Sequence, residues 1–186
     1  MSKETEEKAK DDDRRTSSAL VRPSNVLVDS DSPSPLPSAE RGDGNETAFV
    51  VVSLLSKTDR RIEALEEANG EPADSVHVVC VEGRADNGYD TLRTVNSPGD
   101  LTGLSMRIGE VLSELHEDDV YLYFDDVTSL LQYTDLNTAY RFLNVLTGRI
   151  DAADAVGYFA VTPDAHDERT LNTLRNLFDE TVGEFS

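Results

Sequence analysis

The chain has 186 residues, with 37 acidic and 17 basic side chains and a formal net charge of −20. This length suits one domain that buries an ordinary hydrophobic core. A surface this acidic repels the phosphates of nucleic acids and the head groups of anionic lipids, so we expect neither as a partner. No apolar stretch approaches the length of a membrane span, and the charged amino terminus does not resemble a secretory signal, which together predict a cytoplasmic protein.

Most of the acidic excess lies beyond residue 45. Residues 1–45 include ten acidic and seven basic residues, whereas residues 46–186 include 27 acidic and ten basic residues. Concentrated salt relieves repulsion among surface carboxylates, because the Debye length falls to about 3 Å at 1 M. The charge therefore favours a protein adapted to a salt-rich cytoplasm, and an acidic interaction surface is the alternative.

The first part of the chain shows little regular pattern. Residues 1–21 mix charges of both signs with few large apolar groups, which predicts a disordered tail ahead of a folded domain at 22–186. A short strand is predicted at 25–28, with the sequence NVLV. The Pro- and Ser-rich segment that follows, 29–46, has three prolines at alternate positions and predicts an extended loop.

From residue 47 onward, apolar runs alternate with helical patterns. Continuous apolar runs predict strands buried on both faces, and apolar residues three to four positions apart predict helices. The predicted strands are 47–55, 75–83, 92–95, 120–124, 155–161 and 180–185. The predicted helices follow start signals at Thr58, Ser97, Asp135 and Pro163. This alternation is typical of βαβ units, so we expect an α/β fold with a mainly parallel sheet flanked by helices.

Two aspartates, Asp125 and Asp126, follow the strand at 120–124. In parallel sheets, ligands bind beyond the carboxyl ends of the strands, and a carboxylate there can hold Mg²⁺ beside bound phosphates. Asp125 is therefore the candidate metal ligand. The alternative is a solvated strand end whose carboxylates cap the next turn.

A phosphate cradle is not evident in the sequence. A P-loop has the pattern G-x-x-x-x-G-K-[ST] after a strand, so that backbone N–H groups and a lysine face the phosphates. The Ser-Lys-Thr run at 56–58 matches only the end of that pattern, because Val51 and Ser56 stand at its glycine positions. The segment 29–46 holds no lysine, and no G-x-G-x-x-G motif occurs in the chain. We therefore expect no cofactor, with Mg–ATP as the alternative.

Histidine chemistry has one candidate residue. His166 lies in PDAHDE, where it could act as an acid–base group with Asp164 or Asp167, which leaves a small His-dependent hydrolase as a further alternative. His77 lies in a strand pattern and is expected to be packed. Cys80 is expected to be a buried structural thiol, because a lone cysteine forms no internal disulfide.

Three segments carry a resemblance to a known group of proteins. They are TVNSPGDLTGLSMRIGEVL, YFDDVTSLLQYTDLNTAYRFLNVLTGRI and VTPDAHDERTLNTLRNLFDETV. Over roughly residues 22–185 the chain resembles a haloarchaeal family of degenerate RecA/KaiC-like ATPase domains. The resemblance implies a P-loop NTPase-like three-layer sandwich in which the strand ending in Asp125 corresponds to the Walker B strand. The stretch DDVTSLLQY matches the D-S-L-T-x-L pattern of KaiC-like domains.

The departures from that family pattern are as informative as the match. The Walker A glycines, lysine and hydroxyl and the paired catalytic glutamates have no counterpart, and Asp126 stands where the pattern has serine. Asp125, Thr128 and Gln132 carry over, and Asp125 and Thr128 are the nucleotide-binding candidates. These residues cannot place and neutralise a triphosphate unaided.

The resemblance and its departures together predict a function. We expect a non-catalytic regulatory or interaction domain of a salt-adapted archaeal protein. Its partner would be another protein or a second copy of the chain, because RecA-like domains commonly assemble side by side. The alternative is a nucleotide-responsive protein that binds Mg–ATP with a non-standard cradle.

Overall fold

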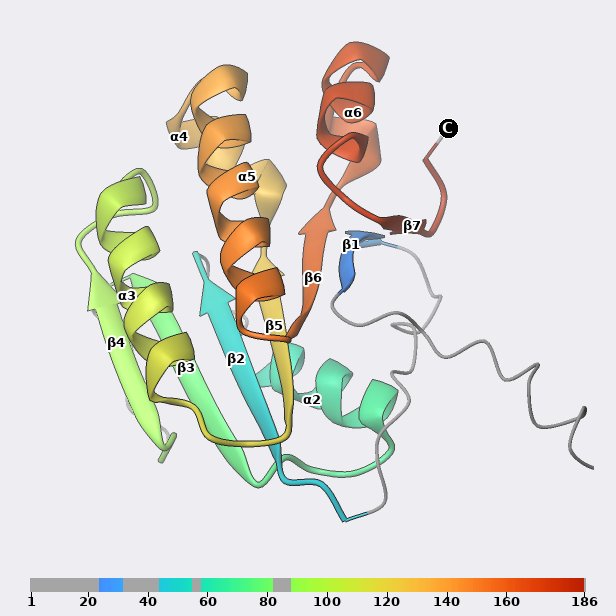
Figure 1. Ribbon diagram of the computed structural model, residues 1–186. Coiled ribbons are helices and arrows are strands. Elements are labelled where there is room, and N and C mark those ends of the chain that lie inside the picture. Colours follow the sequence, from blue (N-terminus) through green and yellow to red (C-terminus); the bar gives the residue numbers. More distant parts are fainter. Residues whose placement is uncertain (1–23, 32–43, 55–57, 82–87, 186) are drawn as a thin grey trace, which may run out of the picture.

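A computed structural model describes residues 24–31, 44–54, 58–81 and 88–185. In these residues, seven strands form one sheet in the order β4-β3-β2-β5-β6-β1-β7, and every pairing between them is parallel (Figure 1). The strands are β1 Ser24–Asp29, β2 Thr47–Ser53, β3 Ser75–Val81, β4 Thr91–Val95, β5 Asp119–Asp125, β6 Val156–Val161 and β7 Glu180–Val182. The predicted parallel α/β fold is confirmed.

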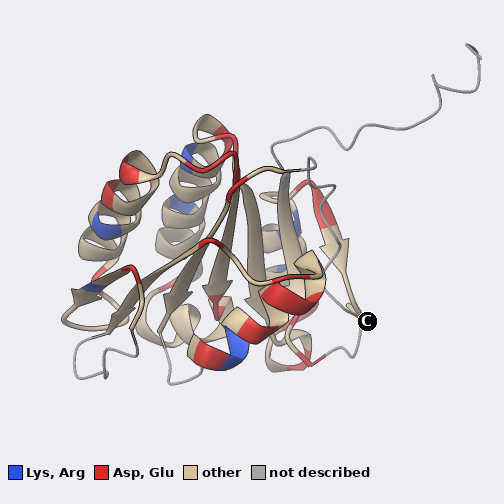
Figure 2. Cartoon of the chain, turned by 90° about the horizontal axis from the view of Figure 1, so that it is seen from below, with Lys and Arg blue, Asp and Glu red and all other residues tan. Residues whose placement is uncertain are grey.

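Helices cover both faces of the sheet, which gives three layers. The helices are α2 Thr58–Asn69, α3 Leu101–Glu114, α4 Val127–Tyr133, α5 Leu136–Ala152 and α6 Glu168–Arg175, with a 3-10 turn, η1, at Pro163–Ala165. On one face, α2 packs Leu65 among side chains that include Phe49. On the other face, Leu104 of α3 and Leu143 of α5 belong to the larger core cluster. Figure 2 shows α2 and the layer of α3 and α5 on opposite sides of the sheet.

The central strands are buried on both faces, as their unbroken apolar runs predict. Every residue of β2, β5 and β6 is buried. Successive side chains of a strand point to opposite faces, so Val50 and Val52 join the cluster under α3 and α5 while Phe49 and Val51 join the cluster under α2. Since β5 lies in the middle of this sheet, Asp125 ends in the middle of its carboxyl edge.

Two predicted helix starts are wrong by a few residues. Asp100 rather than Ser97 caps α3, and its carboxylate accepts a hydrogen bond from the backbone N–H of Gly103 at 2.8 Å. Asp167 rather than Pro163 caps α6, because Pro163 opens the separate turn η1. In both helices an aspartate side chain bonds to a free amide of the first turn, which stabilises a helix start.

Several predictions fall on residues that the structure does not describe. They are the tail at 1–21, most of the loop at 29–46 and most of the Ser-Lys-Thr run at 56–58. In the described part of the chain, no helix combines the length and the apolar character needed to cross a membrane.

Candidate functional site at the carboxyl edge

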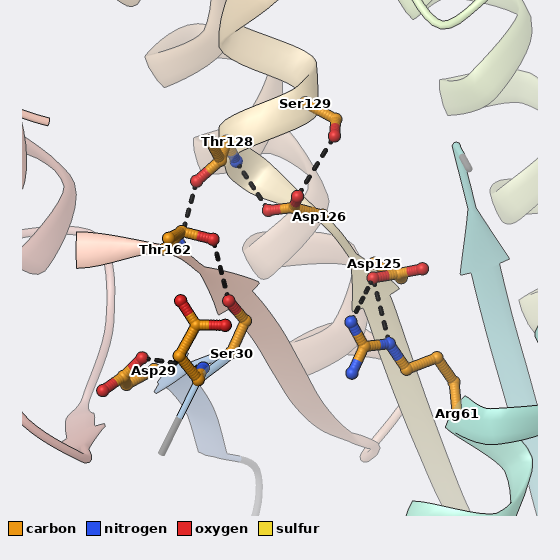
Figure 3. A network of polar contacts seen from close by, with 9 residues as sticks. Asp29, Ser30, Arg61, Asp125, Asp126, Thr128, Ser129 and Thr162 are labelled. Carbon is orange, nitrogen blue, oxygen red and sulfur yellow. Dashed lines mark hydrogen bonds and ion pairs between the residues drawn. The ribbon is translucent and has the colours of Figure 1, made fainter. Parts of the chain in front are cut away.

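Asp125, at the end of β5, forms a buried ion pair with Arg61 of α2 (Figure 3). The Nε and Nη2 groups of Arg61 donate to the same carboxylate oxygen, Oδ1 of Asp125, at 3.0 and 2.8 Å. The two side chains are 13% and 2% exposed. Within the described residues, the second oxygen of Asp125, Oδ2, is buried and accepts no hydrogen bond. The candidate metal ligand is thus already held by a cation of the chain itself.

The surroundings of Arg61 keep its positive charge in place. Burial alone would lower the pKa of Arg61, but the neighbouring Tyr123, Asp125 and Asp126 raise it, and the net shift is upward. The guanidinium carbon lies 5.3 Å from the centroid of the Tyr123 ring, a cation–π distance. Burial raises the pKa of the Tyr123 hydroxyl, which favours its neutral form. Arg61 therefore acts as a permanent counter-ion to Asp125.

The carboxylate of Asp126 caps the helix that follows β5. It accepts hydrogen bonds from the backbone N–H of Thr128 at 2.9 Å and from the hydroxyl of Ser129 at 3.1 Å. This is the arrangement that an N-terminal cap requires, and it satisfies an amide of the first turn of α4. The role of Asp126 at this edge is therefore structural.

Thr128 links the start of α4 to the ends of two strands. Its Oγ1 accepts from the backbone N–H of Thr162, after β6, at 2.9 Å and lies 3.0 Å from Nε2 of His166. The hydroxyl of Thr162 lies 2.8 Å from that of Ser30, directly after β1 (Figure 3). Asp125 and Thr128, predicted together as nucleotide-binding residues, thus lie at one sheet edge but belong to separate polar networks.

At the end of β1, the carboxylate of Asp29 binds nearby backbone N–H groups. Asp29 is 8% exposed, and its two oxygens accept from the backbone N–H groups of Asp31 at 2.9 Å and Glu184 at 3.3 Å. A phosphate cradle at this strand end would direct such N–H groups at the phosphates. Here both donors are bound to Asp29.

His166 lines a cleft of about 410 Å³ beside this network. The other lining residues are Thr128, Leu131, Gln132, Thr134, Asp135, Leu136, Ala165 and Thr170. Burial lowers the pKa of His166, although Asp126 and Asp167 oppose that shift, so the neutral imidazole is favoured. The carboxylate of Asp167, a predicted partner of this histidine, instead accepts from the backbone N–H of Thr170 at 2.8 Å. The side chain that hydrogen-bonds the ring is a threonine.

A second polar cluster lies around the start of β3. The hydroxyl of Ser75 donates to Glu117, and Nε2 of His77 lies 3.0 Å from the same hydroxyl. The serine proton is therefore directed at the glutamate, so His77 does not serve as a base for it. Burial lowers the pKa of His77. Burial acts to raise the pKa of Glu117, but bonds from Ser75 and from backbone N–H groups lower it overall.

Across the described ranges, no group of three or more histidine, cysteine, aspartate or glutamate side chains is arranged to hold a metal ion. Cys80 is buried, as predicted.

Comparison with known proteins identifies the family of the chain. A family model described as "Family of unknown function (DUF7504)" matches residues 23–183. The chain belongs to this family. No protein in a curated collection matches it.

One solved structure from Pyrococcus horikoshii OT3, described as a structural study of project PH0250, is similar to this DUF7504 chain. The two share 12% sequence identity with a TM-score of 0.51, over 86% of this chain and 80% of that one. At this level of identity the similarity shows the α/β fold alone.

Sequence reasoning missed Arg61 as a site residue of this DUF7504 domain. The sequence held part of the signal, because α2 directly follows β2 in the chain, but only the structure shows that β2 is the sheet neighbour of β5. The first turns of a helix that follows a parallel strand lie near the carboxyl edge of the sheet. A basic residue in those turns was therefore a candidate partner for Asp125.

Proposed function

We propose that this chain is a non-catalytic regulatory or interaction domain of a salt-adapted archaeal protein, derived from a RecA/KaiC-like ATPase. The ion pair between Arg61 and Asp125 carries the proposal. Mg²⁺ beside bound phosphates takes carboxylate oxygens as ligands. Arg61 occupies Oδ1 of Asp125 with two N–H donors, so the guanidinium supplies the positive charge that a metal would otherwise supply.

The end of β1 supports the same proposal. The N–H groups of Asp31 and Glu184 are bound to Asp29, so they do not face a ligand. Asp29, Asp125 and Asp126 also place three carboxylates at the ends of β1 and β5, and among the described residues a cation pairs with Asp125 alone of the three. Like charges repel, so this edge disfavours a triphosphate. These contacts of the described residues therefore support a domain that does not bind Mg–ATP.

One observation favours a second candidate, a nucleotide-responsive protein with a non-standard cradle. Oδ2 of Asp125 is buried and accepts no hydrogen bond from the described residues. Buried carboxylate oxygens normally accept a hydrogen bond or bind an ion, so this oxygen is a candidate ligand for Mg²⁺. In this candidate, Arg61 would move away from Asp125 when Mg–ATP binds.

Thermal unfolding in molar KCl, with and without Mg–ATP, separates the two candidates. A ligand that binds only the folded state stabilises it by about 2.7 kcal/mol at a hundredfold excess over its Kd. We expect no rise in Tm at millimolar Mg–ATP. A rise that disappears in Asp125→Asn would support the nucleotide-responsive candidate and contradict ours.

A separate assay addresses the hydrolase candidate. We expect no turnover of a general ester substrate and no release of phosphate from ATP by the purified protein. Ester turnover that His166→Ala abolishes would contradict a non-catalytic domain. His116→Ala is the matched control, because that histidine is exposed and does not line the cleft.

A further inference from the structure

We propose that α5 of one copy of this chain docks against α2 of a second copy, which gives a head-to-tail assembly. This inference rests on the proposed interaction function, for which it names the partner. Its evidence lies in the charges and the exposed apolar side chains of helices on opposite faces of the sheet.

The outer side of α5 differs from the rest of this acidic chain. Its 17 residues include one acid, Asp151, which accepts a hydrogen bond from the side chain of Asn25 at 2.6 Å. Arg141, Val145 and Arg149 are exposed and recur every four residues. Residues four apart lie on one side of a helix, so these three form a basic stripe about 12 Å long.

Exposed apolar side chains lie in the same helical layer. Among the described residues, three large hydrophobic side chains are at least half exposed. They are Met106 on α3, Tyr133 at the end of α4 and Val145 on α5. Arg149 donates to the backbone carbonyl of Ser105, next to Met106, so α3 and α5 pack together at this point. All three apolar side chains lie on helices of one layer, which makes this layer the candidate interaction surface.

On the opposite face of the sheet, α2 carries the complementary charge (Figure 2). Asp59, Glu63 and Glu67 are exposed and also recur every four residues, which makes an acidic stripe of about the same 12 Å length. Of the two arginines of α2, Arg60 is exposed beside this stripe and Arg61 is turned inward to Asp125. The helix therefore presents a negative outer surface.

The two stripes cannot meet within one molecule, because the sheet lies between them. Two copies stacked face to back would place Arg141 and Arg149 against the acidic stripe, with Val145 between the two ion-pairing positions. Complementary charges fix the register of a contact and disfavour other orientations. A contact of this kind uses different surfaces on the two copies, so it generates rings or filaments rather than a closed twofold dimer.

Sedimentation velocity over a wide range of protein concentrations tests the proposal, at low and at molar KCl. We expect wild-type protein to self-associate, and more tightly at low KCl than at molar KCl, because salt screens contacts between exposed charges. We expect the charge reversal R141E/R149E to weaken association by about tenfold or more, and E63R/E67R to do the same. Each variant alone sets like charges against one another, whereas an equimolar mixture restores opposite charges at every contact. The mixture should therefore associate as the wild type does.

Exposed charges on another helix supply the controls. R169E and E168R reverse exposed charges on α6 and are expected to leave association unchanged. A wild-type protein that stays monomeric at every concentration would overturn the proposal. So would an R141E/R149E variant that associates normally, or a mixture that fails to associate. These results would not bear on the proposed lack of ATP binding, which the thermal unfolding experiment with Mg–ATP tests separately.

Discussion

Arg61 and Asp125 form an ion pair in which the Nε and Nη2 groups of the guanidinium donate to the same carboxylate oxygen, at 3.0 and 2.8 Å. The pair joins α2 to the end of the central strand β5 and lies almost entirely out of solvent. Removing one partner from such a pair leaves the other charge buried without compensation, which costs more than the pair itself contributes.

Replacing Arg61 by alanine is therefore expected to lower the free energy of unfolding by about 3–5 kcal/mol, the usual cost of an uncompensated buried charge. Arg60→Ala, at an exposed position of the same helix, is the control and should change it by no more than about 0.5 kcal/mol. Urea unfolding followed by circular dichroism measures both. The double replacement R61M/D125L should recover most of the loss, and equal losses for the two arginines would show that the pair is not buried as described.

The cluster of Ser75, His77 and Glu117 predicts a pH dependence. Burial lowers the pKa of folded His77 below its ordinary value of 6.5, so the folded state binds this proton less readily than the unfolded chain does. Its contribution to stability is then complete above about pH 6.5 and is lost as the pH falls toward the folded-state pKa. The lowered pKa of Glu117 acts in the same direction at more acidic pH.

His77→Gln should therefore flatten the fall in Tm between about pH 7 and pH 5, the range in which an ordinary histidine takes up its proton. His116→Gln is the control, since His116 is exposed. Thermal unfolding at a series of pH values at fixed KCl measures the slope. A His77→Gln protein with the wild-type slope would rule out this residue as the source.

Two glycines are predicted to respond in opposite ways to alanine. A Cβ at Gly157 in β6 would lie 2.8 Å from Oδ1 of Asn25 and 2.9 Å from the ring of Phe159, so Gly157→Ala should cost about 1–3 kcal/mol through overpacking. A Cβ at Gly148 in α5 meets no atom within 4 Å, and Gly148→Ala should stabilise the helix by about 0.5–1 kcal/mol. Chemical denaturation of both variants checks the signs, and a neutral Gly157→Ala would contradict the close packing.

The net charge of −20 predicts that stability rises with salt. Molar KCl screens repulsion among the exposed carboxylates of the folded state, because the Debye length is then about 3 Å. The urea midpoint should increase when KCl is raised from dilute buffer to molar concentration. A midpoint that falls on adding KCl would count against salt adaptation. A matched titration with a neutral osmolyte separates screening from general solvent exclusion.

The strands could be predicted from the sequence because their burial leaves a local signal. The run at 120–124 is apolar at every position, as a strand covered on both faces requires, and Asp125 directly after it marks the carboxyl edge. The partner of Asp125 could not be predicted in the same way. Arg61 lies 64 residues earlier, and local periodicity does not tell which helix turn will face which strand end.

The exact first residue of a helix is also hard to predict from the sequence. Ser97 and Asp100 are both acceptable caps by residue type, and the structure uses Asp100. The contacts of Asp29 at the end of β1 could not be predicted either. The carboxylate of Asp29 binds the N–H of Glu184, 155 residues further along the chain, a contact that only the finished sheet creates.

The place of β1 in the sheet has a consequence for synthesis. This strand is the first of the seven to be translated, yet its neighbours, β6 and β7, are the last two. A nascent chain therefore carries β1 without a partner until residues 156–161 have left the ribosome. Late pairing between distant segments slows folding and exposes strand edges to aggregation. Chains released before β6 is made should be the ones that chaperones and proteases intercept.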